Sequence, residues 1–465
     1  MLQGHNLLKQ NTPKRGDCMS SRIHSGATPD QIKTDLIPLI DFQEEGLSLP
    51  ELESMVETHL LPHLMKYNLP TFQSMFNTSL EEGAEYGARV ALHYNQGVTN
   101  WQVSPGGVML EELCCKALCS LFHLHPTAEA TFMYSGTYAN LQALYLALHW
   151  KAEQEGFDFT THGLSGFDHP LHIVTSCDAH FSVIHAVRTL GLGEKSIISV
   201  PVDEQRRMDT AAVDSAIQAH SDDVFCVMAT AGTTSTGSVD PLPPLLPLCE
   251  NHNIWLHVDA AYGLAYSLVP EYRHLFSGIE KAHSVSWDPH KQMGVPIPSS
   301  VLFLQNNRNF SRMAVHSHYF NREGELNPGL KSPPSTRPFS ALPLVTSIRH
   351  QGLHALIRRL RAPLKAIKSL YEQILTDSTL HVCHIPQLGI LCFRSTPPHV
   401  PEEDLDDLQR HIYTILESEG THSVSMTTLE QKVVLRIVAI SPLITHESLT
   451  ETITHIKEIA IQYRR

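Results

Sequence analysis

The sequence predicts an α/β fold: a large domain with a mainly parallel sheet, a small α+β domain after it and a helical segment before it. Between residues 172 and 304, short apolar runs alternate with helical patterns, which is typical of a parallel sheet covered by helices on both faces. A Pro-rich segment at 327–338 ends this alternation, and a different order of helices and strands follows it. We therefore divide the chain into residues 1–95, 96–345 and 346–465.

The spacing of apolar residues predicts the helices and strands along the chain. The N-terminal segment is polar up to about residue 35 and then shows short apolar patterns that predict helices up to residue 94. Pro50 and the acids after it suit the first turn of one of these helices. In the large domain we expect helices at 108–122, 139–151, 182–190, 209–219 and 245–251, and strands at 172–176, 196–202, 224–231, 254–259, 284–287 and 300–304. In the small domain we expect helices at 345–375, at 402–418 and from 446, and strands at 389–394 and 432–440.

The composition argues against several classes of protein. Hydrophobic residues make up 42% of the 465 residues, and a net charge of −14 without a long basic run argues against nucleic acid or an anionic membrane as the main partner. The nine Cys are odd in number and include no Cys-x-x-Cys, which favours reduced thiols in the cytoplasm over a disulfide framework. No apolar run at the N-terminus indicates a secretory signal, and no stretch of about 18 apolar residues predicts a membrane helix.

Three segments combine residue types with a common chemistry. Lys291 directly follows Asp-Pro-His after the strand at 284–287, and Asp259 ends the apolar strand at 254–259, at the edge where open α/β sheets bind ligands. Residues 135–137, Ser-Gly-Thr, begin a helix whose free N–H groups suit an anion. Taken singly, these are consistent with a solvated lysine, a helix cap and an ordinary turn. Together they supply an amine, a buried carboxylate and a phosphate cradle, the groups that bind pyridoxal 5'-phosphate (PLP).

Residues 98–443 resemble the group II PLP-dependent amino-acid decarboxylases of the glutamate, cysteine sulfinate, diaminobutyrate and aromatic amino-acid type. The resemblance is carried by Trp-Asp-Pro-His-Lys at 287–291, which is similar to the family's Asn-Pro-His-Lys, and by His-Val-Asp-Ala-Ala-Tyr-Gly at 257–263. It implies the aspartate-aminotransferase-like fold (PLP fold type I), PLP as cofactor and α-decarboxylation of an L-amino acid to an amine and carbon dioxide. It also implies a homodimer that pairs through the N-terminal segment, with active sites at the subunit interface.

The resemblance assigns the cofactor residues one by one. Lys291 would bond covalently to PLP, with His290 near the phosphate, and Asp259 would pair with the pyridine nitrogen. Ala261 would pack on one face of the ring and His180 on the other, and the alternative role of His180 is a structural histidine in the core.

The remaining site residues would hold the phosphate and the substrate. Thr233 would face the cofactor or form a turn at a strand end, and Arg436 matches the arginine that binds the substrate α-carboxylate, a contact that a guanidinium suits. Tyr319 matches the tyrosine of the family's mobile catalytic loop, roughly 308–335 here, which returns a proton to Cα after carbon dioxide leaves. A surface salt bridge and a core aromatic residue are the alternatives for these two. The family often has Gly-Gly-Thr at the phosphate, where this chain has Ser135, Gly136 and Thr137.

The substrate is constrained by one neighbour of the site. Phe181, directly after His180, resembles the acidic-substrate and diaminobutyrate branches of the family, so we expect aspartate, glutamate, cysteine sulfinate or diaminobutyrate. A carbon–carbon lyase or an aldehyde-forming oxidative deaminase on the same fold, and a non-catalytic scaffold, are the alternatives. Lys291 and Asp259 argue against the scaffold, and Tyr319 argues against the deaminase.

We expect no metal site. Cys115, Cys119 and His123 share a helical face, where Cys is typical of a packed core. Two His pairs have metal-like spacing but no third ligand: His59 with His63, and His350 with His354. The chain contains 30 His, an excess that the predicted site does not explain.

Overall fold

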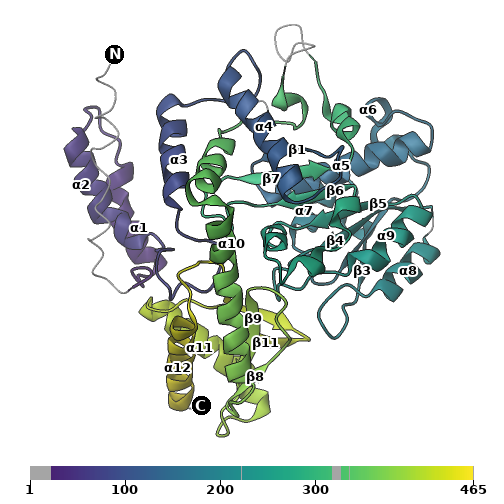
Figure 1. Ribbon diagram of the computed structural model, residues 1–465. Helices are drawn as coiled ribbons and strands as arrows, with labels where there is room; N and C mark the ends of the chain where they lie inside the picture. The colour runs from purple at the N-terminus through teal and green to yellow at the C-terminus, as the bar shows by residue number, and fades with distance from the viewer. Residues whose placement is uncertain (1–21, 221, 317–325, 335, 464–465) are drawn as a thin grey trace.

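The centre of the computed structural model is a seven-stranded sheet with strand order β1-β7-β6-β5-β4-β2-β3 (Figure 1). The structure describes residues 22–220, 222–316, 326–334 and 336–463. β7 runs antiparallel to both of its neighbours, β1 and β6, and the other pairs are parallel. The predicted mainly parallel α/β sheet is therefore confirmed. The strands are β1 (Glu129–Met133), β2 (His172–Ser176), β3 (Ile197–Val200), β4 (Val224–Thr230), β5 (Trp255–Asp259), β6 (Ser284–Trp287) and β7 (Ser300–Leu304).

Helices cover both faces of this sheet, which is why its strands are almost continuously apolar. The helices α5 (Gly136–Gln154) and α7 (Ser182–Thr189) share one hydrophobic core with the sheet, and α6 (Phe159–His162) adds to its rim. The helices of the second core, on the other face, are α4 (Pro105–Leu121), α8 (Thr210–Ala219), α9 (Leu242–Asn251) and the first part of α10 (Ala341–Ile374). Cys115 and Cys119 belong to this core, and burial raises the pKa of the Cys119 thiol to about 12, as expected of packed cysteines.

The small domain is an antiparallel sheet of order β10-β11-β9-β8 backed by helices. Its strands are β8 (Leu380–Val382), β9 (Ile390–Ser395), β10 (Ser425–Leu429) and β11 (Lys432–Val438), and its helices are α11 (Leu405–Glu419) and α12 (His446–Gln462). The long helix α10 joins the two domains, because Leu364 packs in the core of the large domain and Ala366 in that of the small one. The division of the chain at 95/96 and 345/346 stays a prediction, and the second boundary lies inside α10.

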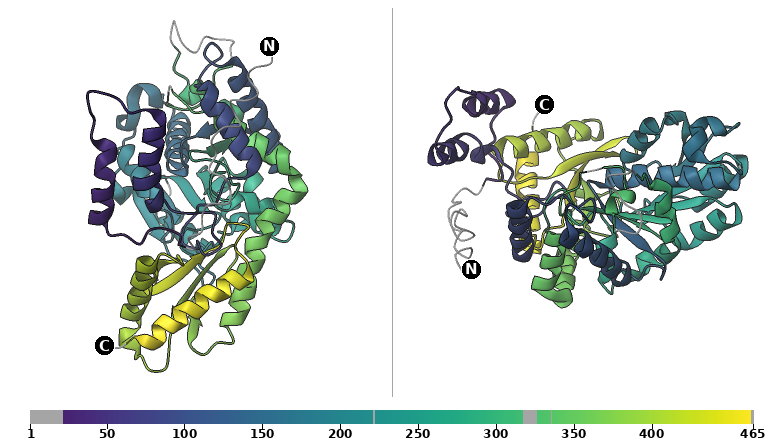
Figure 2. Two further views of the ribbon diagram at one scale, coloured as in Figure 1. Left: turned by 90° about the vertical axis from the view of Figure 1, so that its left-hand side faces the viewer. Right: turned by 90° about the horizontal axis from the view of Figure 1, so that it is seen from above.

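The N-terminal segment contains α1 (Pro29–Leu36), α2 (Leu49–His59) and α3 (Glu82–Tyr94). The first two helices bury no residue and stand apart from the large sheet (Figure 2), whereas α3 packs along α10. Between them the chain passes beside the small domain, where Phe72 pairs with Ser423 and Gln73 accepts a hydrogen bond from the Val438 N–H at 2.7 Å. This path places residues 72–76 next to both domains. None of the described helices is long and apolar enough to cross a membrane.

Candidate active site

The carboxyl edge of the parallel strands brings together residues that are far apart in the sequence. β5 ends at Asp259, and the loops that follow β2 and β6 carry His180 and Lys291. Because all three strands point the same way, these loops leave the sheet at the same edge. The sheet therefore gathers the predicted cofactor residues on one side of the large domain.

Lys291 lies in a turn that its neighbours hold in place. Its Nζ is 3.3 Å from Oδ2 of Asp288 and 5.2 Å from the centre of the Phe76 ring. Asp288 is 4% exposed and accepts a hydrogen bond from the Ser300 hydroxyl at 2.6 Å. The lysine side chain itself is 21% exposed, so its amine is within reach of a ligand while its turn is fixed.

Asp259 is a buried carboxylate whose hydrogen-bond partners, in the part of the chain that the structure describes, are all uncharged. It is 6% exposed and accepts hydrogen bonds from Asn140 Nδ2 at 2.7 Å, from the Ala261 N–H at 3.1 Å and from the Ser286 hydroxyl at 3.3 Å. Among the described residues, no Lys, Arg or His nitrogen lies within 4.0 Å of this carboxylate. A buried carboxylate of this kind is costly unless a positive charge approaches it.

His180 presents a neutral ring to the same space. Its centroid lies 4.0 Å from that of Phe181, and its Nδ1 accepts a hydrogen bond from the Ser182 N–H at 3.1 Å. Burial lowers the pKa of His180; the nearby charge of Asp259 raises that pKa, and the charge of Lys291 lowers it. The imidazole is therefore uncharged near pH 7 with its proton on Nε2, a state suited to packing on an aromatic ring.

The start of α5 forms a tight cradle. Ser135 caps the helix by accepting a hydrogen bond from the Tyr138 N–H, and the first N–H groups of a helix are available to an anion. A Cβ on Gly136 would lie 2.8 Å from Oδ2 of Asp288 and 3.3 Å from Cβ of Ala261. Only glycine fits this close approach, which places the predicted phosphate residues Ser135, Gly136 and Thr137 against the turn of Lys291.

Two predicted cofactor residues, His290 and Thr233, form hydrogen bonds with nearby residues of their own loops. His290 donates from Nδ1 to the Ser299 carbonyl at 2.6 Å, and burial lowers its pKa, so the ring is neutral. The Thr233 hydroxyl lies 2.9 Å from that of Thr236 and accepts a hydrogen bond from the Ser238 N–H at 3.1 Å. Thr233 therefore takes part in the turn at the end of β4, and its contact with the cofactor stays a prediction.

Arg436 reaches the site from the small domain. It is buried on β11, donates to the Ser425 hydroxyl at 2.8 Å and to the Thr234 carbonyl at 2.6 Å, and lies 5.8 Å from the centre of the Phe76 ring. Lys291 lies at 5.2 Å from the same ring, so both cations lie beside one phenyl group. Tyr319 lies outside the described residues.

Comparison with known proteins places this arrangement in a family. A family model described as the pyridoxal-dependent decarboxylase conserved domain matches residues 29–396. The chain belongs to the pyridoxal-dependent decarboxylase family.

Relatives of known activity cover most of this decarboxylase. The L-2,4-diaminobutyrate decarboxylase of Rhizobium meliloti (strain 1021) is 27% identical over 449 residues, which cover 95% of this chain and 88% of that protein. The cysteine sulfinic acid decarboxylase of Mus musculus is 28% identical over 394 residues, covering 83% of this chain and 78% of that protein. The crystal structure of mouse CSAD in apo form has the same fold, with a TM-score of 0.88, 24% identity and coverage of 95% of this chain and 94% of that chain.

The described residues fit the cofactor of a pyridoxal-dependent decarboxylase. The Asp259 carboxylate needs a positive charge, which a protonated pyridine nitrogen would supply. The neutral ring of His180 and the small side chain of Ala261 would suit packing against a flat heterocycle, and the start of α5 offers N–H groups to a phosphate. The chain is thus a PLP-dependent carboxy-lyase acting on an amino acid, and the scaffold interpretation is wrong.

Sequence analysis missed Asn140, which joins the site residues to one another. Its Nδ2 donates to Asp259 at 2.7 Å and to the Ser182 hydroxyl at 2.9 Å, and its Oδ1 accepts from the Ser286 hydroxyl at 2.8 Å and lies 3.0 Å from Nε2 of His257. The signal was available, since Asn140 lies one helical turn after Gly136 and faces the same way. Phe76 gave no signal, because its place beside Lys291 depends on how the N-terminal segment passes between the domains.

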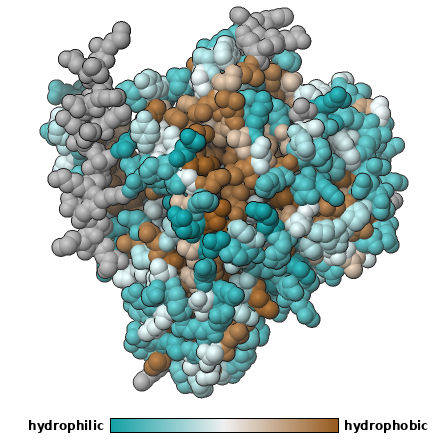
Figure 3. All heavy atoms as spheres, viewed as in Figure 1, coloured by the Kyte–Doolittle hydropathy of each residue, from teal (hydrophilic) through white to brown (hydrophobic). Residues whose placement is uncertain are grey.

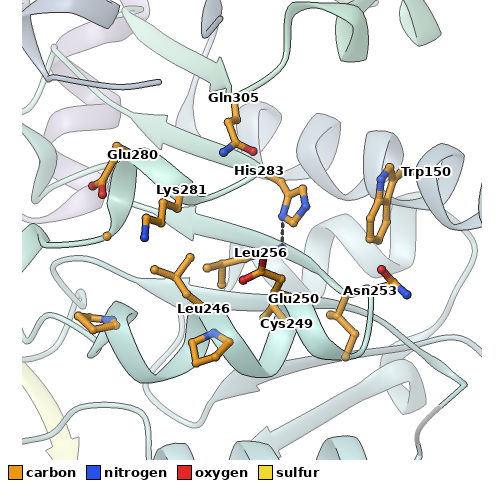
Figure 4. Close-up of a pocket in the computed structure, with 14 residues that line it drawn as sticks. Trp150, Leu246, Cys249, Glu250, Asn253, Leu256, Glu280, Lys281, His283 and Gln305 are labelled. Carbon is orange, nitrogen blue, oxygen red and sulfur yellow. Dashed lines mark hydrogen bonds between the residues drawn. The ribbon is translucent and has the colours of Figure 1, made fainter. Parts of the chain in front are cut away.

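A separate cavity of about 670 Å³ opens at the opposite edge of the sheet, where β5 and β6 begin (Figure 4). Its walls come from α5, α9 and the starts of these strands, and it contains none of the predicted cofactor residues. His283 lines it, accepts a hydrogen bond from the Leu256 N–H at 3.0 Å and has its pKa lowered to about 4 by burial. This cavity therefore does not belong to the decarboxylation site.

Proposed function

We propose that this enzyme removes the α-carboxylate of a short acidic amino acid, with Lys291, Asp259 and Arg436 as the residues that define the reaction. The observation that carries this proposal is the placement of Lys291 and Arg436 near one Phe76 ring, with the buried carboxylate of Asp259, which has no cationic partner among the described residues, at the same edge of the sheet. Bound PLP supplies an electron sink for the pair of electrons left at Cα when carbon dioxide departs.

Lys291 and Asp259 would hold the cofactor, and Arg436 would orient the substrate. Lys291 would hold the cofactor through its amine, and Asp259 would keep a proton on the pyridine nitrogen. Arg436 would bind the α-carboxylate and fix its direction relative to the ring, since a guanidinium can contact both carboxylate oxygens. Its burial would keep the carboxylate away from water, which favours loss of neutral carbon dioxide. Tyr319, outside the described residues, would return the proton to Cα.

For the substrate, we propose aspartate, glutamate or cysteine sulfinate, with diaminobutyrate as the second candidate. Phe181 supports this choice, because it packs on His180 and is 59% exposed beside the site. The relatives that act on cysteine sulfinate and on diaminobutyrate support the same short substrates.

The test is release of carbon dioxide from a panel of L-amino acids by the PLP-loaded protein, with the amine identified for each. We expect the highest kcat/KM for one of the short acidic substrates, and turnover abolished in Lys291→Ala. Preference for an aromatic amino acid would overturn the substrate proposal, and aldehyde with hydrogen peroxide in place of the amine would overturn the proposed reaction.

We also propose a homodimer that pairs through the N-terminal helices. Large apolar side chains are exposed on α2, on α3 and on the loop before α2, among them Phe42 at 89% and Leu92 at 79% exposure. Hydrophobic residues also gather in the middle of the face seen in Figure 3. Such patches are typical of protein interfaces. Light scattering should give twice the mass of one chain, and a monomer at micromolar concentration would contradict this.

We propose a cytoplasmic location as well. The eight described cysteines are all free thiols, which is typical of a reducing compartment. Fractionation of the native cells tests it, with activity in the soluble fraction as the expected result and activity in a membrane or organelle fraction as the contrary one.

A further inference from the structure

A group of metal-binding side chains lies at the edge of the sheet opposite the decarboxylation site. His172 is the first residue of β2, His220 follows α8, and Asp223 directly precedes β4. Because β2 and β4 are parallel neighbours with His172 opposite Val224, their first residues lie side by side. One ligand atom from each of the three side chains lies within 4.8 Å of the other two.

The backbone fixes this arrangement. The N–H of His172 donates to the Asp223 carbonyl at 2.8 Å, and the N–H of Asp223 donates to the His220 carbonyl at 2.9 Å. These two main-chain hydrogen bonds therefore hold His220 and Asp223 next to the start of β2 without help from the side chains. The three side chains are half-buried.

One of the imidazoles has an unsatisfied nitrogen. Nδ1 of His172 is buried and has no hydrogen-bond partner among the described residues, although buried polar atoms are almost always paired. The rings of His172 and His220 lie 5.0 Å apart at 57°, a contact that satisfies neither ring's nitrogens. A metal ion coordinated by this nitrogen would satisfy it.

A second layer of polar residues supports the carboxylate. Oδ1 of Asp223 lies 3.0 Å from Nδ1 of His169, whose Nε2 lies 3.0 Å from the Glu155 carboxylate, which in turn pairs with Lys151 at 3.1 Å. Carboxylate ligands of metal ions are usually held by such hydrogen bonds, which set the direction of the free oxygen. The other oxygen of Asp223 has no side-chain partner among the described residues, and it is the one that would bind an ion.

We propose that His172, His220 and Asp223 form a zinc site that joins the residue after α8 and the residue before β4 to the start of β2. Two imidazoles and one carboxylate are ligands that Zn²⁺ accepts, with water in the fourth position. The site is structural, because it lies at the amino edge of the strands whereas Lys291 and Asp259 lie at the carboxyl edge. Sequence analysis predicted no metal site because His172 is far from His220 and Asp223 in the chain, so no local pattern contains all three residues.

The test uses the PLP-loaded protein after treatment with a chelator, titrated with Zn²⁺ in a calorimeter and with Co²⁺ in a spectrophotometer. We expect one Zn²⁺ per chain, visible cobalt bands of a four-coordinate site and a higher melting temperature with zinc. In His220→Gln and in Asp223→Asn, the affinity should fall by at least about tenfold. The PLP absorption band of each variant reports that it is folded.

The control is His354→Gln, which removes an exposed imidazole on α10 that lies outside the cluster. It should bind Zn²⁺ like the natural protein. The proposal is overturned if the natural protein binds no stoichiometric Zn²⁺, or if His220→Gln and Asp223→Asn keep the same site and affinity. If one variant fails to fold, the other decides between these outcomes.

Discussion

Asn140→Ala offers the sharpest test of how the site is held together. Asn140 is 1% exposed and makes four hydrogen bonds inside the core. After truncation, Ser286 can still donate to Asp259, but Oδ2 of Asp259 and Nε2 of His257 lose the partners described above. At about 1–3 kcal/mol for each buried group left unpaired, we expect a loss of about 2–6 kcal/mol in the free energy of unfolding.

The same change should weaken cofactor binding, because the carboxylate would no longer be held in one orientation. A hydrogen bond to a charged group contributes about 1.5–3 kcal/mol, so the Kd of PLP should rise roughly 10- to 100-fold. The assay is titration of the apoprotein with PLP, followed by absorbance, beside thermal melting of the same samples.

Gln142→Ala is the matched control. Gln142 is also buried on α5, but its amide donates to the Lys331 carbonyl at 2.5 Å and does not contact Asp259. It should lower stability while leaving the Kd of PLP unchanged. The reasoning is refuted if Asn140→Ala lowers the melting temperature and yet binds PLP as tightly as the natural protein.

Three further predictions concern substrate binding, pH and the core. Arg436→Ala should lower kcat/KM by about 100-fold or more, because two charge-assisted contacts to the substrate would be lost, and unchanged steady-state kinetics would contradict its role. Burial raises the pKa of Asp377, but hydrogen bonds, chiefly from Lys457, outweigh this and lower it to about 2. Asp377→Asn should therefore lower the free energy of unfolding by about 1–2 kcal/mol at neutral pH. Urea melts should show that the difference between the variant and the natural protein shrinks as the pH falls from 4 to 2, and a difference that stays constant would contradict this. Glu111→Ala should lower the free energy of unfolding by about 3–5 kcal/mol because it removes the carboxylate partner of the buried Arg337 guanidinium, whereas Glu85→Ala at an exposed pair should cost under about 1 kcal/mol; equal melting temperatures would contradict this.

The large domain was predictable because its strands are short apolar runs between turns. β2, β6 and β7 begin and end at the predicted residues. β1, β8 and β10 were missed. β10 is buried only at its two end residues and contains Ser and Thr, and β8 has three residues, so neither shows an apolar run. The antiparallel direction of β7 depends on the return of the chain after Lys291, which no local pattern records.

Some residues of the site could likewise be predicted from the sequence, and others could not. Lys291 and Asp259 stand in local motifs, so their chemistry could be inferred from neighbours in the sequence. Asn140 and Phe76 act through contacts between distant segments, and these became visible only in three dimensions. The phosphate, substrate and ring-packing roles given to the individual residues stay predictions.

The central claim is a covalent bond between the Lys291 amine and the aldehyde carbon of PLP. The most direct measurement is borohydride reduction of the PLP-loaded protein, followed by proteolysis and mass spectrometry of the labelled peptide. The account predicts one phosphopyridoxyl group per chain, on Lys291. A label on another lysine, or a protein that binds PLP without forming any reducible bond, would contradict it.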